Sequence, residues 1–386
     1  MSHNTSHLLL ACVRCAIEGK LLPKEAAEGA RENLPELYSL SKHHDLSHLL
    51  FDVLRDGEVI QKGDEYYNKF EKQKLTAIYR SMKLESELSR IKATLSESKI
   101  RHIPLKGAII RKLYPAPYMR TSCDVDILVS EETLDDAISI LTERLSYTTD
   151  GVRHFHDVSL YSPSGIHLEL HFSILEKEEK LDKVLSKVFE YTLPSEESYS
   201  LKLDNEFLIF HLLAHTCYHF LNGGSGIKPF IDLRFLITAL DFSREKLDLL
   251  CKEAEIEKFC AACECLTRVW FFGGEHSDLT RKMEDFIIRG GVYGSHDNKN
   301  AIEQNKAGGK LRHIRSLIFP SFSTMKVMYP VLERHSILLP ICHIRRWCRI
   351  IFTGKIKRSV RIIKSNASVT EEERQNLGEL FEMLEL

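Results

Sequence analysis

Apolar residues recur every three or four positions along the first part of the chain. The segments LPELYSLSKHHDLSHLLFDVLRD (34–56) and YYNKFEKQKLTAIYRSMKLESELSRIKATLSES (66–98) both follow this spacing, and the second alternates acidic and basic residues on its polar side. Such spacing places the apolar side chains on one face of an α-helix. The pattern therefore predicts an N-terminal helical region over residues 1–98.

The pattern changes at Lys99, where short apolar runs bounded by turn residues replace the helical spacing. The run CDVDILVS alternates in steps of two, which is typical of a β-strand. The run SEETLDDAISILTERL starts with a serine and several acidic residues, which favour the start of a helix. The predicted elements are a strand at 99–107, a helix at 108–115, a strand at 123–130, a helix at 130–145, and the two strands of a hairpin at 156–162 and 166–172.

Helical spacing returns after this mixed segment, first in a charged connector at 176–191 and then in longer apolar runs. Those runs are 206–221, 230–240 and 244–272. A polar, glycine-bearing segment at 290–309 predicts one long break in the helical pattern.

The predicted fold class is therefore α+β. A small mixed β-sheet with helices packed on it makes up the core at 99–200, and helical regions at 1–98 and 201–386 flank this core. The core also contains the residues whose chemistry is least expected of a buried strand.

Two aspartates, Asp124 and Asp126, lie one residue apart in the strand RTSCDVDILVS. Successive side chains of a strand point to opposite faces, so the two carboxylates share one face and the apolar residues beside them face the core. Carboxylates are rarely buried without a partner, and two this close raise each other's pKa unless a cation balances them. A divalent metal ion is the predicted partner, and solvated acids on an exposed edge strand are the alternative.

A third carboxylate, Glu169, lies in the strand IHLELHF on the same face as His167 and His171. If this strand neighbours the aspartate strand, the three acids meet. Oxygen ligands favour Mg²⁺ or Mn²⁺, and three carboxylates on adjacent strands suit a two-metal phosphoryl-transfer centre. The alternative is a solvent-facing glutamate beside two histidines.

The turn HIPLKGAII precedes the aspartate strand and leads from a strand into a helix. Free backbone amides at the start of a helix suit a phosphate, because they donate hydrogen bonds and carry the positive end of the helix dipole. Gly107 would let the backbone approach the phosphate, and Lys106 would add a positive charge. Together with the acidic strand, the turn predicts a nucleotide phosphate as ligand.

These motifs resemble the signature of the nucleotidyltransferase superfamily with the polymerase-β-like fold: a glycine turn, alternating aspartates, and a later strand with a glutamate between apolar residues. More closely, the chain looks like a bacterial family of uncharacterised nucleotidyltransferases, often associated with polysaccharide or peptide-modification gene clusters. The segments that carry this likeness are LKGAIIRKLYP, RTSCDVDILV, LELHF, HLLAHTCYHF, FIDLRFLI and LIFPSFSTMKVMYPVLERHSILLP.

The resemblance implies roles for seven residues. These are catalysis and binding of Mg²⁺ or Mn²⁺ by Asp124, Asp126 and Glu169, nucleotide or phosphate binding by Lys106, Gly107 and Arg120, and a place lining the site for His171. The implied reaction transfers a nucleoside monophosphate from a nucleoside triphosphate to an acceptor and releases pyrophosphate. The base, the acceptor (a saccharide, peptide, protein or RNA) and the oligomeric state stay open.

One departure from the superfamily pattern concerns the turn, where Ala108 follows Gly107 in place of the usual serine and offers no hydroxyl to a phosphate. Two alternatives to the transferase are therefore open. One is a degenerate nucleotide-binding or scaffold protein that keeps the ligands without turnover. The other is a glycosyltransferase with an Asp-x-Asp metal motif, but that fold places several strands before the motif, whereas mainly helical residues precede it here.

Histidines recur at every fourth position in the run HLLAHTCYH, so His211, His215 and His219 share one helix face. The run lacks the acidic partner of a metalloprotease helix. Packing, with a hydrogen bond from a histidine to Asp232, is the favoured interpretation, and contact with the acceptor is the functional alternative. His215 and Asp232 are therefore candidates for the cleft.

Composition narrows the setting of these motifs. With 386 residues and 43% hydrophobic residues the chain can bury a large core in two or three subdomains. The net charge of -2 gives no global attraction to nucleic acid or membrane. No run approaches the length of a membrane-spanning helix and the N-terminus has no basic leader, so we expect no membrane span and a cytoplasmic protein.

The ten cysteines fall mostly within helical patterns, and reduced thiols are expected. Cys12 and Cys15, like Cys260 and Cys263, have CxxC spacing, but the flanking residues lack the glycine knuckles of zinc sites. Small buried side chains are therefore favoured over structural zinc.

Charge is polarised near the end of the chain. Residues 345–364 carry only basic charges, and the following EEERQNLGELFEMLEL is mostly acidic. The favoured interpretation is that the two pieces pair with each other or are solvated. A basic face for an anionic acceptor is the alternative.

Overall fold

The chain folds into two compact units. The first runs to Tyr218 and resumes at Gly226–Thr280, and the second comprises His219–Ser225 and Arg281–Leu386. The structure is a computed structural model that describes residues 3–292, 294–353 and 356–386. The three regions predicted from the sequence, at 1–98, 99–200 and 201–386, were defined by residue pattern, and their bounds stay a prediction. The first compact unit extends beyond residue 200, where the predicted core ends. The reason is that helices after the sheet pack against elements that lie between its strands.

Five helices open the first unit and include the helical segments predicted from the spacing. Their apolar faces meet in a core that fully buries Leu9, Leu50 and Leu54. Burial of an amphipathic face supplies most of a helix's stability in a protein. The helices are α1 (His3–Glu18), α2 (Lys24–Glu32), α3 (Leu34–His43), α4 (Ser47–Asp56) and the long α5 (Glu65–Glu97).

A five-stranded mixed sheet follows, with strand order β1-β2-β5-β4-β3. β2 and β5 run parallel, and the other neighbouring strands are antiparallel. The α+β class with a mixed sheet is therefore confirmed. The strands are β1 (His102–Pro104), β2 (Asp124–Val129), β3 (Thr148–Arg153), β4 (Asp157–Tyr161) and β5 (His167–His171), with α6 (Gly107–Ile110) and α7 (Leu134–Leu145) between them.

The predicted hairpin is confirmed as β4 and β5, whereas β3 was missed. All six residues of β3 are exposed, so this edge strand has no buried side to give its sequence an alternating pattern. A separate two-stranded ribbon, β6 (Thr192–Pro194) with β7 (Leu201–Leu203), was also missed because each strand is only three residues long.

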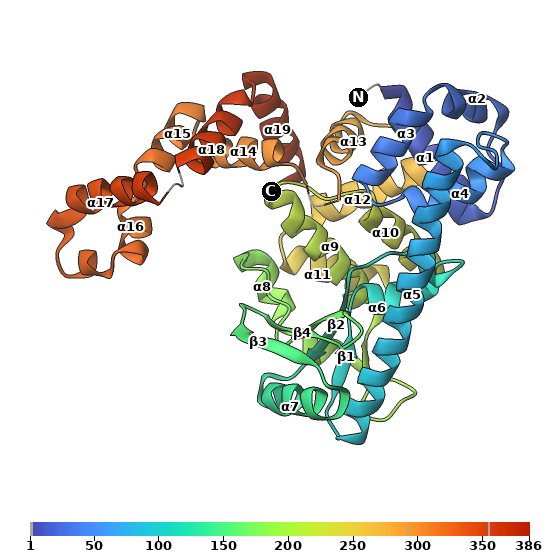
Figure 1. Ribbon diagram of the computed structural model, residues 1–386, viewed down its shortest axis with the longest axis horizontal. Coiled ribbons are helices and arrows are strands. Elements are labelled where there is room, and N and C mark those ends of the chain that lie inside the picture. The colour runs from blue at the N-terminus through green and yellow to red at the C-terminus, as the bar shows by residue number, and fades with distance from the viewer. Residues whose placement is uncertain (1–2, 293, 354–355) are drawn as a thin grey trace. The chain divides into compact units, whose positions relative to one another are not determined.

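The two faces of the five-stranded sheet differ. Helices α5 and α7 cover one face (Figure 1), and their apolar side chains join those of the strands in one cluster. Leu84 and Ile91 of α5, Leu141 of α7, and Ile127 and Leu168 of the sheet belong to this cluster. The side chains that alternate with these strand residues point to the opposite face, where the acids lie.

More helices complete the first unit after the sheet, as the apolar runs predicted. The loop at 222–227 joins two of them and resembles a phosphate loop only in composition, because it follows a helix rather than a strand. The helices are α8 (Glu179–Leu185), α9 (Asn205–Leu221), α10 (Lys228–Ala239), α11 (Arg244–Glu253) and α12 (Glu257–Phe272).

The second unit is helical, and the break predicted at 290–309 is wrong because it contains α14. Ser295 caps this helix by accepting a hydrogen bond from the backbone of Asn298, and Ala301 and Ile302 are buried. With so few apolar residues, the periodic signal is weak. The helices are α13 (Asp278–Gly290), α14 (His296–Lys306), α15 (Lys310–Ile318), α16 (Phe322–Met328), α17 (Leu339–Phe352), α18 (Ile356–Ser368) and α19 (Glu371–Leu384).

Two further expectations from the sequence were reduced cysteines and the lack of a membrane-spanning helix. All ten cysteines, each of them within the described residues, are free thiols, and most are buried. In the described part of the chain, no helix has both the length and the apolar character needed to cross a bilayer.

His48 gives the fold a dependence on pH. Its ring nitrogen Nε2 lies 2.9 Å from the backbone oxygen of Met119, and burial lowers its pKa from 6.5 to about 4. The unfolded chain binds a proton to this ring more readily than the folded chain does. The stabilisation is therefore complete above pH 6.5 and is lost as the pH falls from 6.5 towards 4.

We expect acid to destabilise the protein through His48 by up to about 3 kcal/mol between pH 7 and pH 4. Urea unfolding followed by far-UV circular dichroism at several pH values measures this loss. The variant His48→Gln keeps a donor for Met119 but cannot titrate, so its stability should fall less steeply with acid. Equal slopes for the two proteins would contradict this assignment.

Candidate functional site

The parallel pairing of β2 and β5 positions the acids. In the register of these strands Asp126 lies opposite Glu169 and Asp124 lies opposite His167. Paired residues of neighbouring strands point to the same face, so all four side chains leave the sheet on the side away from α5 and α7. The two strands come from separate segments of the chain, and their register makes one polar cluster.

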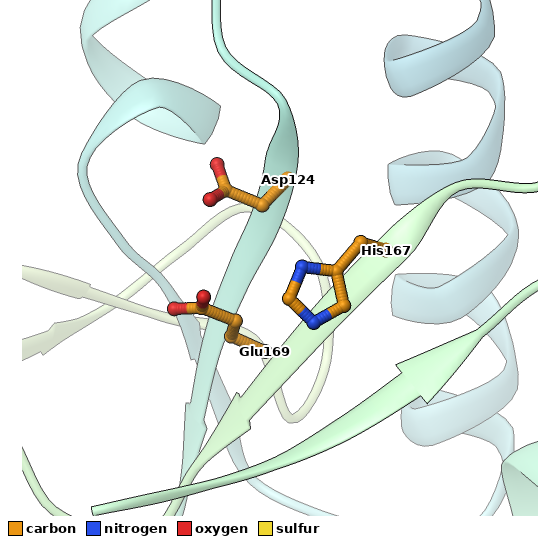
Figure 2. Close-up of side chains that lie close together, drawn as sticks. All are labelled: Asp124, His167 and Glu169. Atoms are coloured by element: carbon orange, nitrogen blue, oxygen red, sulfur yellow. The ribbon is translucent and has the colours of Figure 1, made fainter. Parts of the chain in front are cut away.

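Asp124, His167 and Glu169 form the outer part of this cluster. Figure 2 shows the two carboxylates and the imidazole ring on the same side of the two strands. Each can offer one ligand atom such that the three atoms lie within 4.8 Å of one another, and each side chain is half-buried. This spacing suits a shared cation that remains accessible from solvent.

Asp126, Glu169 and His171 form the inner part, again with ligand atoms within 4.8 Å of one another. His171 Nε2 lies 3.1 Å from Asp126 Oδ1 and 3.4 Å from Glu169 Oε2. Lys106 Nζ donates to the same oxygen of Asp126 at 3.2 Å. Asp126 and His171 are both buried, so the innermost carboxylate has two cationic or polar neighbours on one of its oxygens.

The acids differ in how readily they ionise. Burial, followed by the charges of Asp126 and Glu169, raises the pKa of Asp124. Burial also opposes ionisation of Asp126, but Lys106 and His171 outweigh it and hold its pKa well below the usual range. The hydrogen bond from His171 lowers the pKa of Glu169. Asp124 is thus the one of the three acids that makes no ion pair among the described residues.

The donor set fits a divalent cation. Among the described residues, the carboxylate oxygens of Asp124 accept no hydrogen bond, and those of Asp126 and Glu169 bond only through Asp126 Oδ1 and Glu169 Oε2. Glu169 belongs to both groups, so its carboxylate connects Asp124 at the outer part of the cluster with Asp126 at the inner part, although the three acids do not form one group by themselves. Carboxylate oxygens are the ligands of Mg²⁺ and Mn²⁺, and the His167 imidazole is compatible with Mn²⁺.

The turn that precedes β2 brings Lys106 to the acids. Lys106 has a backbone φ of 43°, which is unusual for a residue with a side chain, and leads into α6. α6 is only four residues long, so its dipole is a weaker attraction for phosphate than the sequence implied. The Lys106 ammonium group is therefore the main positive charge that the turn supplies.

The Ala108 side chain points into the core beneath the sheet. A serine at this position would place its hydroxyl among apolar side chains rather than beside a phosphate. Ala108 therefore contributes to the core and not to the polar face of the site.

Arg120 does not contact the acids in the described structure and instead pairs with Asp232. Its Nη2 donates to Asp232 Oδ2 at 2.8 Å, and the Tyr114 hydroxyl donates to Oδ1 at 2.7 Å. Asp232 is buried. A hydrogen bond from a histidine to Asp232, favoured by the sequence, is therefore wrong, because the arginine of the β1–β2 connection reaches this carboxylate.

Gly107 makes room for this arrangement. A Cβ atom at this position would lie 2.4 Å from Arg120 Nη1 and 3.4 Å from Arg111 Nη2. Arg111 Nε also donates to the Gly107 carbonyl oxygen at 2.7 Å, and burial lowers its pKa to about 10. The glycine thus allows two guanidinium groups to pack against the turn next to the acids.

His215 faces the same region from α9 but pairs with Glu176. Its Nδ1 lies 2.6 Å from Glu176 Oε1, and burial together with the charge of Lys106 lowers its pKa to about 3. His211, one turn earlier, is buried, and its pKa is also lowered to about 3, mainly by burial. Neutral imidazoles therefore lie near the polar face of the sheet.

Sequence reasoning missed three residues of this site: His167, Arg111 and Glu176. Strand alternation already placed His167 on the face of Glu169, so the sequence could have indicated His167 as a candidate ligand. Arg111 falls in an ordinary helical run, and Glu176 lies in the segment after β5. No local pattern marks either residue, because their partners come from distant parts of the chain.

Acids on neighbouring strands of a mixed sheet, with a lysine turn beside them, are an arrangement suited to binding a metal and a phosphate. A family model described as uncharacterised nucleotidyltransferase matches residues 31–272, more than half of the chain. The chain belongs to this family, which supports a transferase acting on a nucleoside triphosphate. No curated protein and no solved structure matches the chain.

The Arg120–Asp232 pair predicts a stability test. Asp232→Asn leaves a buried guanidinium without a counter-charge, and we expect a loss of about 3–5 kcal/mol in the free energy of unfolding. Urea unfolding measures this loss. As the control, Glu264→Gln removes the carboxylate of the more exposed pair with Arg244, and the loss should stay below about 1 kcal/mol. Similar losses in the two variants would contradict the importance of the buried pair.

Proposed function

We propose that the protein is a metal-dependent nucleotidyltransferase. It transfers a nucleoside monophosphate from a nucleoside triphosphate to an acceptor: the acceptor oxygen forms a bond to the α-phosphorus, the bond to the bridging oxygen breaks, and pyrophosphate leaves. The observation that carries the proposal is the in-register pairing of Asp126 with Glu169, beside Asp124, in a member of this family.

The acids have distinct parts in this proposal. Asp124 and Asp126, each together with Glu169, would hold Mg²⁺ or Mn²⁺ at the outer and inner parts of the cluster, and His167 would add a nitrogen donor at the outer part. When bound, the cation polarises phosphoryl oxygens and offsets the charge that develops during transfer. Glu169, which is half-buried, also orients the acceptor or accepts its proton.

Lys106 and His171 contact the acids and hold them in position. Lys106 donates to Asp126 from the turn, and its ammonium group is placed to contact a phosphate that approaches the acids. His171 contacts both Asp126 and Glu169 and is a positioning residue, because it fixes the orientation of two ligands from neighbouring strands. His156 stacks on the His171 ring with centroids 5.3 Å apart and restricts its rotation.

The finer assignments follow from the same features. We infer that the sheet is the core of the polymerase-β-like superfamily in a bacterial protein of the cytoplasm, with nucleotide bound over the polar face. The family match and the acid-bearing parallel strands support the superfamily part of this inference, and the bacterial and cytoplasmic setting rests on the sequence resemblance alone. His215 and Asp232 then contribute through their partners, Glu176 and Arg120.

One observation favours a second candidate, a nucleotide-binding protein without turnover. The Lys106 ammonium group donates a hydrogen bond to Asp126 Oδ1 and so neutralises a carboxylate of the proposed metal site. Ala108 also supplies no hydroxyl. In this candidate the lysine takes over part of the cation's charge, and a nucleotide binds without being transferred. A glycosyltransferase has no such support, because helices α1–α5 precede the acidic strand.

The transferase predicts label transfer from a nucleotide. Purified protein is mixed with Mg²⁺ or Mn²⁺, each α-labelled nucleoside triphosphate and a cell extract, and labelled products are separated. We expect Asp124→Asn and Asp126→Asn each to reduce transfer by at least about 100-fold, because each removes a charge that stabilises the transition state.

The matched control for this assay is Asp136→Asn, an exposed aspartate of α7 on the other side of the sheet. This variant should transfer label at the rate of the natural sequence. Nucleotide binding without transfer to any component would favour the second candidate. Transfer that survives both strand variants would contradict the assignment of the acids.

The metal site predicts a binding change that does not depend on turnover. Titration of Mn²⁺ followed by electron paramagnetic resonance measures the free ion, whose signal falls on binding. We expect His171→Gln to weaken binding by about 10–100-fold, since it releases the ligands that it orients. Glu169→Gln should weaken it at least as much, and Asp136→Asn should leave it unchanged. Equal Mn²⁺ binding by all variants would contradict a metal site at these residues.

A further inference from the structure

The second unit carries a strong local excess of positive charge. Between Lys310 and Lys364 there are thirteen lysine and arginine residues and one acidic residue, Glu333. Over the whole chain the two kinds of charge nearly balance, with 53 basic and 55 acidic residues. The excess is therefore a property of this segment, which contains α15, α16 and α17.

The acidic tail makes no ion pair with the basic residues at 345–364 among the side chains that the structure describes. The side chains of residues 354–356, 358, 359 and 362 lie outside that description. α19 instead uses Glu371 within its own first turn and Glu379 to pair with Lys282. Of the two favoured possibilities, pairing of the two pieces is not seen among the described residues, and the exposed Arg345 and Arg349 agree with the solvated one.

Helix α17 has a fixed inner face. Arg346 donates to the backbone oxygens of Leu317 and Ile318 at 3.1 Å, and the Trp347 indole N–H donates to Ile318 at the same distance. These bonds occupy carbonyl groups at the end of α15. Cys342 is buried on the same helix in a small cluster with Met325 and Leu332. The contacts determine which side of α17 faces outward.

The outward side carries an apolar stripe, made of Ile341, Ile344, Cys348 and Ile351. These residues are spaced by three and four and so lie on one helix face. The three isoleucines are 61%, 57% and 55% exposed, and Cys348 is also exposed. Isolated exposed apolar residues are common, but a continuous stripe marks an interaction surface.

Exposed residues extend and flank this outer stripe. Ile337 and Phe352, both 86% exposed, lie before the stripe and at the end of the helix. Arg345 and Arg349 are exposed and lie beside the stripe at helical spacing. In Figure 1, α16 lies beside α17, and its Val327 is 84% exposed. Apolar side chains flanked by arginines characterise helices that lie in a membrane interface.

We propose that the outer stripe of α17, with its flanking arginines, docks the protein on an anionic phospholipid surface. The helix lies flat, with the isoleucines among the acyl chains near the headgroups and the arginines on lipid phosphates. Its 14 residues give a length of roughly 21 Å, shorter than a bilayer-spanning helix. Charge complementarity identifies the surface as anionic.

Other occupants fit the stripe less well. A second copy of the chain would bring the same arginines against each other, and the stripe is too short for a coiled coil, which needs three or more heptads. Single-stranded nucleic acid is bound by basic grooves with stacking aromatic rings. Here the exposed residues are aliphatic, and the Trp347 indole is engaged with Ile318.

Co-sedimentation of the full chain with lipid vesicles tests the proposal. Vesicles of phosphatidylcholine mixed with phosphatidylglycerol should bind the protein, and vesicles of phosphatidylcholine alone should bind it much more weakly. Replacing Arg345 by Gln should reduce binding by about fivefold at low salt. The double variant Ile344→Ser with Ile351→Ser should reduce it by about tenfold or more at low and at high salt.

The matched control replaces two exposed leucines of the first unit, Leu21→Ser with Leu249→Ser, which are 72% and 59% exposed. This variant should bind vesicles as the natural sequence does, and circular dichroism should show all the variants folded. Equal binding by the stripe variant and the control would overturn the proposal. A dimer that the stripe substitutions dissolve, or binding of single-stranded RNA without vesicle binding, would also overturn it. Neither result would affect the label-transfer assay.

Discussion

The parallel pairing of β2 and β5 is the constraint on which the site depends. It brings Asp126 against Glu169 and Asp124 against His167, so like charges from distant segments lie within a few ångströms on one face. Carboxylates this close and partly buried repel one another, and the repulsion must be offset by cations. The protein supplies part of that charge from Lys106 and His171, and the carboxylates of Asp124 and Glu169 are only half-buried.

The surroundings of the acids are built from paired polar groups. Arg120 and Tyr114 satisfy the buried carboxylate of Asp232, and this pair ties the connection before β2 to helix α10. His215 and Glu176 form a second pair near the polar face. A buried charge that loses its partner is costly, so these pairs hold the elements around the acids in place while leaving Asp124 and Glu169 available.

The two units differ in their physical properties. The first concentrates acids on a rigid sheet, where small movements would change the distances between ligands. The second has a smaller apolar core around Met325 and Leu332 and presents apolar and basic side chains on the outside of α17. The proposed metal-dependent chemistry, which needs fixed geometry, thus lies on the sheet, and the surface proposed to contact lipid lies on α17.

Local patterns determined the elements with strong periodicity. Alternation in β2 and β5 predicted which side of each strand is polar, and it thereby indicated Asp124, Asp126 and Glu169. The exposed strand β3 and the polar helix α14 have no such alternation or apolar stripe, so the sequence did not show them. Tertiary structure alone decided that Arg120 pairs with Asp232 and that His215 pairs with Glu176, because the choice among several charged partners depends on distances between elements far apart in the chain. For the same reason the sequence marked α17 as basic, whereas only the packing of Arg346 and Trp347 determined that its isoleucines face outward.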